Sequence, residues 1–507
     1  MARSFMNIAI LHYAGPPGLG GVELTIHHHA RLLCADGHRV RLVAGSGTST
    51  VAGVEQHINP LFGSRGAMIE RVNRALAQGD VADDFLTLYR ETLIVLRDAL
   101  DGADVVMVHN VMTLHKNLAL TAALRTLHDD AAFGGLLAWC HDFAWRDPLY
   151  LPELHPGQPW DLLRTPWPRT RYVVVSDDRR TMLADLLGLD EAQIAVVTPG
   201  VDPQALLKLE AASMALILQH GLFGADPLLL LPARITRRKN IEQAIRIIAA
   251  LVERGLRPKL VVTGTPGPHN PTNVTYLAQL QELQAASAAR DAILWLYSAY
   301  CDADGRPLPV DDNMLADFYR IADGLLFPSR AEGFGMPMIE AALSGLPIFC
   351  SDIAPFRETA GDAAHYFDPQ GDPAMAAAQI AAVLRDDARY VLKKRVARAY
   401  TWEAIYQSKI TPLLTGDADE CGIAVHRAYY AHRARRRGEY VQGSLTGNST
   451  KGSATAAPRG SSTGPPSRRR CCGAGYRGSA RRSLAERWSS GGAALPQRAR
   501  YDRGLSQ

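Results

Sequence analysis

The fold class is decided by residues 7–44, NIAILHYAGPPGLGGVELTIHHHARLLCADGHRVRLVA. A short apolar run at 7–12 leads into a glycine-rich loop at 14–21, and apolar residues then recur with helical spacing from 22 to 34. Gly37 ends this helix, and a second apolar run follows at 40–44. A strand, a loop, a helix and a strand in this order predict the opening of a doubly wound parallel sheet.

The same alternation continues along the chain and restarts near residue 228. Further strands are predicted at 105–108, 135–139, 172–175, 194–197, 228–233, 259–264, 293–296, 324–327 and 347–350. Helices are predicted at 85–100, 114–127, 241–253, 276–286, 314–321 and 338–344. We therefore predict an α/β protein with two Rossmann-like doubly wound domains, residues 1–205 and 206–400, that face each other across a cleft. A helix at 401–415 could return to the first domain.

Composition places the chain among globular proteins but sets its last part aside. Of the 507 residues 47% are hydrophobic and 21% charged, and the net charge is +4. After residue 415 there are 17 Lys and Arg against 6 Asp and Glu, with no sustained apolar period, so residues 416–507 are predicted to form a disordered basic tail. This tail is interpreted either as a solvated extension or as a binding segment for nucleic acid or an anionic membrane. We do not expect nucleic acid as a partner.

Long apolar runs and CxxC pairs are both missing from the sequence. No run of about 18 apolar residues occurs, and the first residues lack the pattern of a signal peptide. A cytoplasmic protein is expected, and association with the inner face of a membrane stays open. The seven cysteines are scattered without a CxxC pair, so neither a zinc site nor a disulfide framework is predicted.

The segment FPSRAEGFGMPMIE at residues 327–340 carries the clearest chemistry. Glu332 precedes a glycine loop, a helix begins near Pro337, and Glu340 lies about one turn inside that helix. Unpaired amides and the helix dipole favour phosphate or sugar oxygens at such a helix start. The two carboxylates can contact two parts of one extended ligand. The alternative is a capping loop followed by a solvated glutamate.

Two other motifs argue against familiar cofactor sites. The GGVE sequence at residues 20–23 does not have the spacing of a dinucleotide-binding loop, and no acidic residue ends the second strand, which counts against NAD. Three consecutive histidines, His27 to His29, cannot share one face of a helix, so no metal site is predicted there.

The sequence EGFGMPMIE, followed by AALSGLPIFCSDI, resembles the retaining glycosyltransferases of family four. These are GT-B enzymes that use nucleotide-sugar donors, and the resemblance covers roughly residues 6–415, most strongly 228–360. It implies transfer of a hexose from a nucleoside diphosphate to a hydroxyl acceptor, with retention at the anomeric carbon and with no metal or other cofactor. In the front-face mechanism of this family, a phosphate oxygen of the leaving diphosphate takes the proton of the acceptor.

The resemblance also implies roles for residues on the donor side. Arg234 and Lys239 would hold the diphosphate, and their positive charges suit that role. Arg237 and Arg238 are interpreted as solvated. Glu332 would contact the hexose and Glu340 the ribose. Backbone amides that contact the donor would come from Gly20, Gly21, Gly333, Phe334, Gly335 and Met336.

A histidine after a strand of the first domain would contact the transferred sugar or the acceptor. His141 is the first candidate for this role and His109, which precedes Asn110, is the second. Asp142 would orient His141 or bind the acceptor. The loop at 266–273 is longer than the family pattern, and His269 within it has no assigned role.

Two alternatives to a glycosyltransferase remain at this stage. One is another GT-B enzyme, such as a nucleotide-sugar epimerase, and the other is a sugar-nucleotide binding protein or a nucleic-acid adaptor. The sequence does not determine the donor base, the sugar, the acceptor, the linkage or the oligomeric state.

Overall fold

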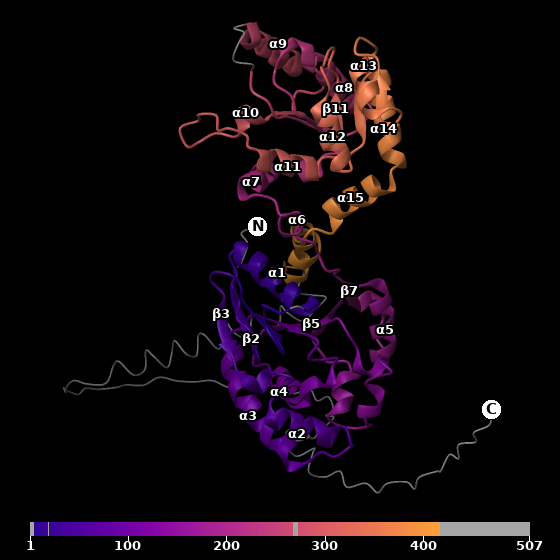
Figure 1. Ribbon diagram of the computed structural model, residues 1–507. Helices are drawn as coiled ribbons and strands as arrows, with labels where there is room; N and C mark the ends of the chain where they lie inside the picture. Colours follow the sequence, from indigo (N-terminus) through magenta and orange to yellow (C-terminus); the bar gives the residue numbers. More distant parts are fainter. Residues whose placement is uncertain (1–4, 19, 267–271, 416–507) are drawn as a thin grey trace, which may run out of the picture. The chain divides into compact units, whose positions relative to one another are not determined.

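The computed structural model describes residues 5–18, 20–266 and 272–415 of the chain (Figure 1). The predicted tail at 416–507 and His269 lie outside the described residues. The chain divides into two compact units. Unit 1 contains the described residues up to Val197 together with residues 413–415, and unit 2 contains Thr198–Pro412. The division falls at Val197, whereas the sequence analysis places it after residue 205.

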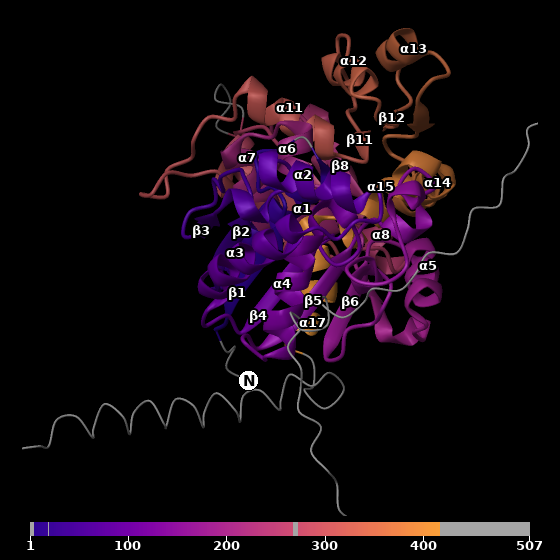
Figure 2. The same ribbon diagram turned by 90° about the horizontal axis from the view of Figure 1, so that it is seen from below.

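Unit 1 is built on a seven-stranded parallel sheet with the order β3-β2-β1-β4-β5-β6-β7. Its strands are β1 (Asn7–His12), β2 (Arg39–Ala44), β3 (Glu55–Ile58), β4 (Val105–His109), β5 (Gly135–Cys140), β6 (Thr170–Val174) and β7 (Ile194–Val196). Its α-helices are α1 (Gly21–Ala35), α2 (Ala67–Leu76), α3 (Asp83–Leu100), α4 (Leu118–Asp129) and α5 (Asp177–Leu187). Helices α3 and α4 pack side by side in both views (Figures 1 and 2).

Helix α4 begins later than the apolar spacing predicts. The sequence places a helix at 114–127, but residues His115–Asn117 form a 3₁₀ turn and the α-helix starts at Leu118. The reason is a cap: the Asn117 side chain accepts a hydrogen bond from the amide of Leu120.

Unit 2 contains a six-stranded parallel sheet with the order β10-β9-β8-β11-β12-β13. Its strands are β8 (Leu228–Leu231), β9 (Lys259–Val262), β10 (Ile293–Trp295), β11 (Gly324–Phe327), β12 (Ile348–Ser351) and β13 (His365–Phe367). Its helices are α6 (Pro203–Leu207), α7 (Ala211–Gln219), α8 (Ile241–Glu253), α9 (Thr272–Ala286), α10 (Leu296–Ala299), α11 (Asp312–Ile321), α12 (Met336–Leu343), α13 (Ala354–Ala360), α14 (Pro373–Asp386), α15 (Ala388–Ala399) and α16 (Trp402–Ile405).

The last described residues leave unit 2 and join unit 1. After α16 a π-helical turn, Tyr406–Ile410, leads to α17 (Thr411–Thr415). Within unit 1, the Arg171 guanidinium donates a hydrogen bond of 2.7 Å to the carbonyl of Leu413. Among the described residues, no helix is both long and apolar enough to cross a membrane.

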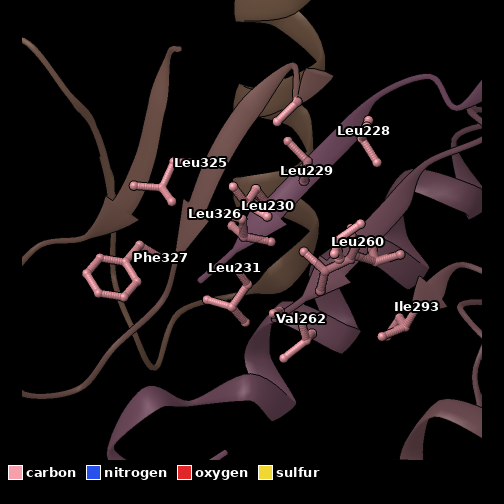
Figure 3. Close-up of a cluster of buried hydrophobic side chains, with 14 of the residues drawn as sticks. Leu228, Leu229, Leu230, Leu231, Leu260, Val262, Ile293, Leu325, Leu326 and Phe327 are labelled. Carbon is pink, nitrogen blue, oxygen red and sulfur yellow. The ribbon is translucent and has the colours of Figure 1, made fainter. Parts of the chain in front are cut away.

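The centre of the unit 2 core is formed by strand side chains that are apolar on both faces of the sheet. Leu228 to Leu231 are all buried, and Figure 3 shows them beside Leu260, Val262, Ile293 and the residues Leu325 to Phe327 of β11. Strands covered by helices on both faces read as continuous apolar runs rather than as alternating patterns. This is why the sequence predicts these strands well.

The strand order of each sheet reverses at one place. In unit 1 this place lies between β1 and β4, and in unit 2 between β8 and β11. Ligands of open parallel sheets bind at the carboxyl ends of the strands at this point. The two doubly wound, Rossmann-like sheets confirm the predicted fold class, and they direct attention to the loops that follow β1, β4, β8 and β11.

Candidate active site

In unit 2, the loops after β8 and β11 start side by side. Leu230 of β8 pairs with Leu325 of β11 in register. The first loop runs to a 3₁₀ turn, Arg237–Lys239, before α8, and the second runs to α12. The amide of Arg330 donates a hydrogen bond of 2.8 Å to the carbonyl of Arg238, so the two loops are directly joined.

The loops bring Lys239 and Glu332 together in an ion pair that is almost fully buried. The Lys239 ammonium donates to Oε1 of Glu332, and only 10% and 8% of the two side chains are exposed. Ser329 donates to the same oxygen at 2.9 Å, and Arg238 donates to Oε2 at 3.0 Å. Arg238 is solvated, as expected, with 57% of its side chain exposed, and it also forms an ion pair with Glu332 that the sequence does not predict.

Asn240 fixes the turn that presents Lys239. It is buried, it adopts the left-handed conformation with φ of 52°, and its side-chain amide donates to the carbonyls of Pro328 and Pro369 at 3.0 and 2.9 Å. Asparagine tolerates this conformation better than most residues. The Lys239 ammonium also lies 4.9 Å from the centre of the Phe327 ring, a cation–π contact that helps to hold it in place.

Arg234 lies in the same loop as Lys239 but is exposed. Among the described residues no hydrogen bond or ion pair involves its side chain, so its guanidinium is open to a ligand. The loop around it is held close to the loop after β9, where the amide of Ile235 donates to the carbonyl of Thr265 at 3.0 Å. Gly264 permits this approach, because a Cβ there would lie 2.2 Å from the carbonyl oxygen of Ala233.

Helix α12 begins at Met336, and its N-cap residue, Gly335, provides no side-chain cap. Gly335 has φ of 97°, a conformation that side chains rarely adopt. The amide of Met338 donates to the carbonyl of Gly335, and Pro337 has no N–H. The amides of Gly335 and Met336 donate to no acceptor among the described residues. The predicted binding segment therefore offers open amides at a helix start, which suits anionic or sugar oxygens.

Glu340 is held on the far side of this turn by Tyr319. The Tyr319 hydroxyl donates to Oε2 of Glu340 at 2.6 Å. Burial raises the pKa of Tyr319 above its ordinary value, and the bond to Glu340 adds to the effect, so the tyrosine stays a donor. Glu332 and Glu340 thus have different partners: Glu332 lies in the loop after β11 and Glu340 lies within α12.

In unit 1, four imidazoles gather at the carboxyl ends of β1, β4 and β5. This imidazole cluster consists of His12, His29, His109 and His141. The carbonyl of His109 bonds to Nδ1 of His12 at 2.8 Å, and Nδ1 of His109 lies 3.1 Å from Nε2 of His141. The ring of His29 packs 4.5 Å from that of Trp139 and 5.5 Å from that of His109, measured between ring centres.

Burial keeps the whole cluster neutral at ordinary pH. Burial lowers the pKa of His29 to about 3 and that of His141 to about 4. It also lowers the pKa of His12, and it lowers the pKa of His109 well below the usual range, with a further contribution from the neighbouring imidazoles. The two predicted histidines, His141 and His109, therefore belong to one cluster of contacting imidazoles. His12 and His29 were not identified from the sequence.

The hydrogen bond between His109 and His141 assigns their tautomers. Nε2 of His109 is buried and has no hydrogen-bond partner among the described residues. A buried N–H without an acceptor is avoided in folded proteins, so the proton of His109 belongs on Nδ1, where it is donated to Nε2 of His141. Neutral His141 then carries its proton on Nδ1 and can donate it to a ligand oxygen.

Asn110 shapes the turn that carries His141. Asn110 has φ of 59°, and its side-chain oxygen accepts from the amides of His141 and Asp142 at 2.8 and 3.2 Å. Its NH₂ group donates to the carboxylate of Asp142 at 3.3 Å, and Arg179 approaches that carboxylate at 4.0 Å. The structure shows Asp142 bonded to Asn110, and His141 oriented by His109 instead.

The first loop of unit 1 ends at the start of α1. Gly20 precedes the helix without a side-chain cap, and the first intrahelical bond runs from the amide of Leu24 to the carbonyl of Gly20. The first-turn amides from Gly21 onward therefore point out of the helix. A Cβ on Gly20 would lie 2.0 Å from a carboxylate oxygen of Glu23, so the Glu23 side chain packs against this loop.

Two family models match consecutive stretches of the chain. The model for Glycosyltransferase Family 4 matches residues 19–205, and that for Glycosyl transferases group 1 matches residues 216–400. The chain is 25% identical to mannosylglucosylglycerate synthase from Thermotoga maritima, over 69% of this chain and 83% of that protein. It is 30% identical to D-inositol 3-phosphate glycosyltransferase from Geodermatophilus obscurus, over 51% of this chain and 55% of that protein.

Solved structures of glycosyltransferases also align with the chain. One is WaaG, a glycosyltransferase involved in lipopolysaccharide biosynthesis, at 16% identity over 81% of this chain and 100% of that one, with a TM-score of 0.30. A TM-score of 0.30 is too low to support an argument, so the family assignment rests on the sequence matches and on the two sheets.

The two Rossmann-like parallel sheets fit the GT-B fold, and the two family matches identify the chain as a glycosyltransferase of this class. The chain belongs to the group 1 glycosyltransferases. This confirms the family expected from EGFGMPMIE, and it sets aside the epimerase, binding-protein and adaptor alternatives.

Proposed function

We propose that this enzyme transfers a hexose from a nucleoside diphosphate to a hydroxyl acceptor with retention at the anomeric carbon. The polar groups described above supply what that reaction needs: cations for a diphosphate, amides for sugar oxygens, and an imidazole donor. The acceptor is a glycan, a lipid-linked sugar or a small polar molecule. Several relatives are named mannosyltransferases, so a mannosyl donor is the first to test.

The donor side of the proposal rests on unit 2. Arg234 and Lys239 would bind the diphosphate and stabilise the charge that develops on it as it leaves, and no metal is required. Glu332 would contact the hexose and Glu340 the ribose. The backbone amides of residues 333–336 would donate to sugar or phosphate oxygens, as would the first-turn amides at Gly20 and Gly21 of unit 1.

In unit 1, His141 would act as a hydrogen-bond donor. Its lowered pKa makes it neutral at pH 7, and its tautomer places the proton on Nδ1. A neutral donor can hold a sugar hydroxyl or the oxygen of an acceptor in place. The proton of the acceptor would pass to an oxygen of the leaving diphosphate, so the protein would contribute mainly positioning and charge stabilisation.

One observation supports the proposal above the others. Residues 93 positions apart in the chain, Lys239 and Glu332, meet in a buried ion pair at the switch point of the sheet in unit 2. A buried ion pair costs desolvation and is weak evidence for stability. Its place at the point where such sheets bind ligands therefore favours a functional role.

The test uses the full chain and a panel of nucleotide sugars that includes GDP-mannose and UDP-glucose. Release of the nucleoside diphosphate measures turnover, and NMR of the product shows the configuration of the new glycosidic bond. We expect Lys239→Ala and Glu332→Gln each to lower kcat/KM by more than about tenfold, the scale of one lost charge-assisted contact.

Two exposed residues of unit 2 provide matched controls. Lys409→Ala and Glu253→Gln make the same chemical changes away from the switch point and should leave kcat/KM unchanged. Circular dichroism checks that all four variants are folded. Full activity in both Lys239→Ala and Glu332→Gln would contradict the site assignment, and an inverted product would contradict the retaining mechanism.

A further inference from the structure

A second concave surface lies at the opposite edge of the unit 2 sheet from Lys239 and Glu332. It is a pocket of about 740 Å³ between the amino end of β8, the end of α14 and the length of α15. Asp226 and Pro227, which line it, come directly before β8. We call it the α15 pocket. It shares no residue with the proposed donor site.

The α15 pocket gathers positive charge on an acidic body. Five cationic side chains line it, Arg254, Arg385, Lys394, Arg395 and Arg398, against the single carboxylate of Asp226. Over residues 1–415 the chain has 38 Lys and Arg but 45 Asp and Glu. A cluster of this sign on a body of the other sign is a local feature and not a consequence of the overall composition.

Two of the five cations, Arg398 and Lys394, have anionic partners within the fold. The side chain of Asp226 accepts hydrogen bonds from the Tyr390 hydroxyl and from Arg398. The Lys394 ammonium is buried, pairs with Asp323 and donates to the carbonyl of Ala225 at 2.9 Å. These contacts join α15 to the start of β8 and are structural.

The other three cations have no strong anionic partner among the described residues. Among the described residues, Arg254 has no ion pair. The ion pair of Arg385 is with its neighbour Asp386 at 3.6 Å, where both side chains are about three-quarters exposed and the pair is weak. Arg395 donates to the Tyr400 hydroxyl at 3.2 Å, which does not neutralise it. Three guanidinium groups that line one pocket without a strong anionic partner make that pocket attractive to an anion.

The rest of the lining is apolar. Pro227 and Leu384 are buried, and Leu256 and Val391 line the same pocket. The volume falls in the range of small-ligand sites. Guanidinium groups match the geometry of phosphate oxygens, and apolar side chains suit a hydrocarbon or aromatic group beside that phosphate.

We propose that the α15 pocket binds a phosphate ester that carries an apolar or aromatic group. The phosphate contacts Arg254, Arg385 and Arg395, and the apolar group packs against Leu256 and Val391. Two sources supply this chemistry, a free phosphorylated metabolite and the headgroup of an anionic lipid. Neither source requires the donor site, so binding should persist when that site is disabled.

The experiment uses the full chain with Lys239→Ala, which removes a proposed donor-phosphate contact. Binding of phenyl phosphate is measured by calorimetry, and binding to vesicles of equimolar phosphatidylcholine and phosphatidylglycerol by sedimentation. The test variant adds Arg254→Ser, Arg385→Ser and Arg395→Ser. The control adds Arg246→Ser, Arg290→Ser and Arg306→Ser, three exposed arginines of unit 2 that do not line the pocket.

We expect the test variant to bind at least about tenfold more weakly than the control variant in one of the two assays. Weaker binding of phenyl phosphate identifies a free metabolite as the source, and weaker binding to vesicles identifies a lipid headgroup. The basic residues after 415 are present in both variants, so their contribution cancels. Equal binding by test and control variants in both assays would overturn the proposal.

Discussion

Replacing His29 with glutamine tests whether the imidazole cluster of unit 1 is a neutral buried assembly. Burial lowers the pKa of His29 to about 3 in the folded protein, whereas an exposed histidine in the unfolded chain has a pKa of about 6.5. At about pH 5.5 the unfolded histidine therefore binds roughly 0.9 of a proton and the folded one almost none. Proton linkage makes this difference a slope of about 1.2 kcal/mol in the free energy of unfolding per pH unit.

The sign of this slope follows from the lowered pKa. Because the unfolded state binds more protons, the stability that His29 gains by staying neutral is fully present above about pH 6.5. It is lost as the pH falls from there toward 3, the folded pKa of His29. His29→Gln removes this dependence, so the variant should lose stability less steeply with acid than the wild type does.

Hydrogen exchange detected by mass spectrometry reads this slope locally. Peptides that cover β4 and β5 report the free energy of opening of unit 1, after correction for the intrinsic effect of pH on exchange, and peptides from β8 and β11 of unit 2 serve as an internal control. His57→Gln, a change on β3 outside the cluster, is the matched control. Parallel wild-type and His29→Gln curves between about pH 5 and 6.5 would refute the reasoning.

Two further substitutions test the loops that carry the proposed site. Gly335→Ala should destabilise unit 2 by about 1–3 kcal/mol, because φ is 97° and the new Cβ would lie 2.9 Å from the Phe356 ring. Calorimetry should show a lower Tm for unit 2, and an unchanged Tm would contradict this prediction. Asn110→Ala removes the hydrogen bonds to the amides of His141 and Asp142, so kcat should fall by more than about tenfold while the KM for the donor stays at its wild-type value. Steady-state kinetics that give wild-type values of both kcat and KM would refute the positioning role.

The sequence predicts the central strands of both sheets because their physics is local. Strands such as β8, Leu228–Leu231, are apolar on both faces and are bounded by turn residues. The edge strand β3, Glu55–Ile58, was missed because its sequence EQHI is mostly polar and it is mostly exposed. Helix α5, Asp177–Leu187, was missed because acidic and basic residues fill much of it, and a Ser176 cap starts it instead.

The candidate site was predictable where it depends on one loop. The glycine loop before α12, with Glu332 and Glu340, is a contiguous motif, and its open helix start is confirmed. The imidazole cluster was not, because His12, His109 and His141 meet only through the pairing of β1, β4 and β5. One signal was present: His12 and His109 are each the last residue of a buried strand, the position where such sheets bind ligands.

The contact between Lys239 and Glu332 changes how the two residues should be understood. The resemblance assigns them to separate tasks, the diphosphate and the hexose, but the structure joins them and adds Arg238 and Ser329 as further donors to the carboxylate. Glu332 therefore orients the ammonium of Lys239, and removing either residue leaves a buried charge without its main partner. Because the two residues act together, each single substitution should lower kcat/KM by more than that residue alone contributes to the reaction. The two losses should therefore not add in the double variant. Arg237 of the same loop donates to Gln279 and packs over the Tyr276 ring, whereas the Arg234 side chain has no partner among the described residues and is therefore the most open to an incoming diphosphate.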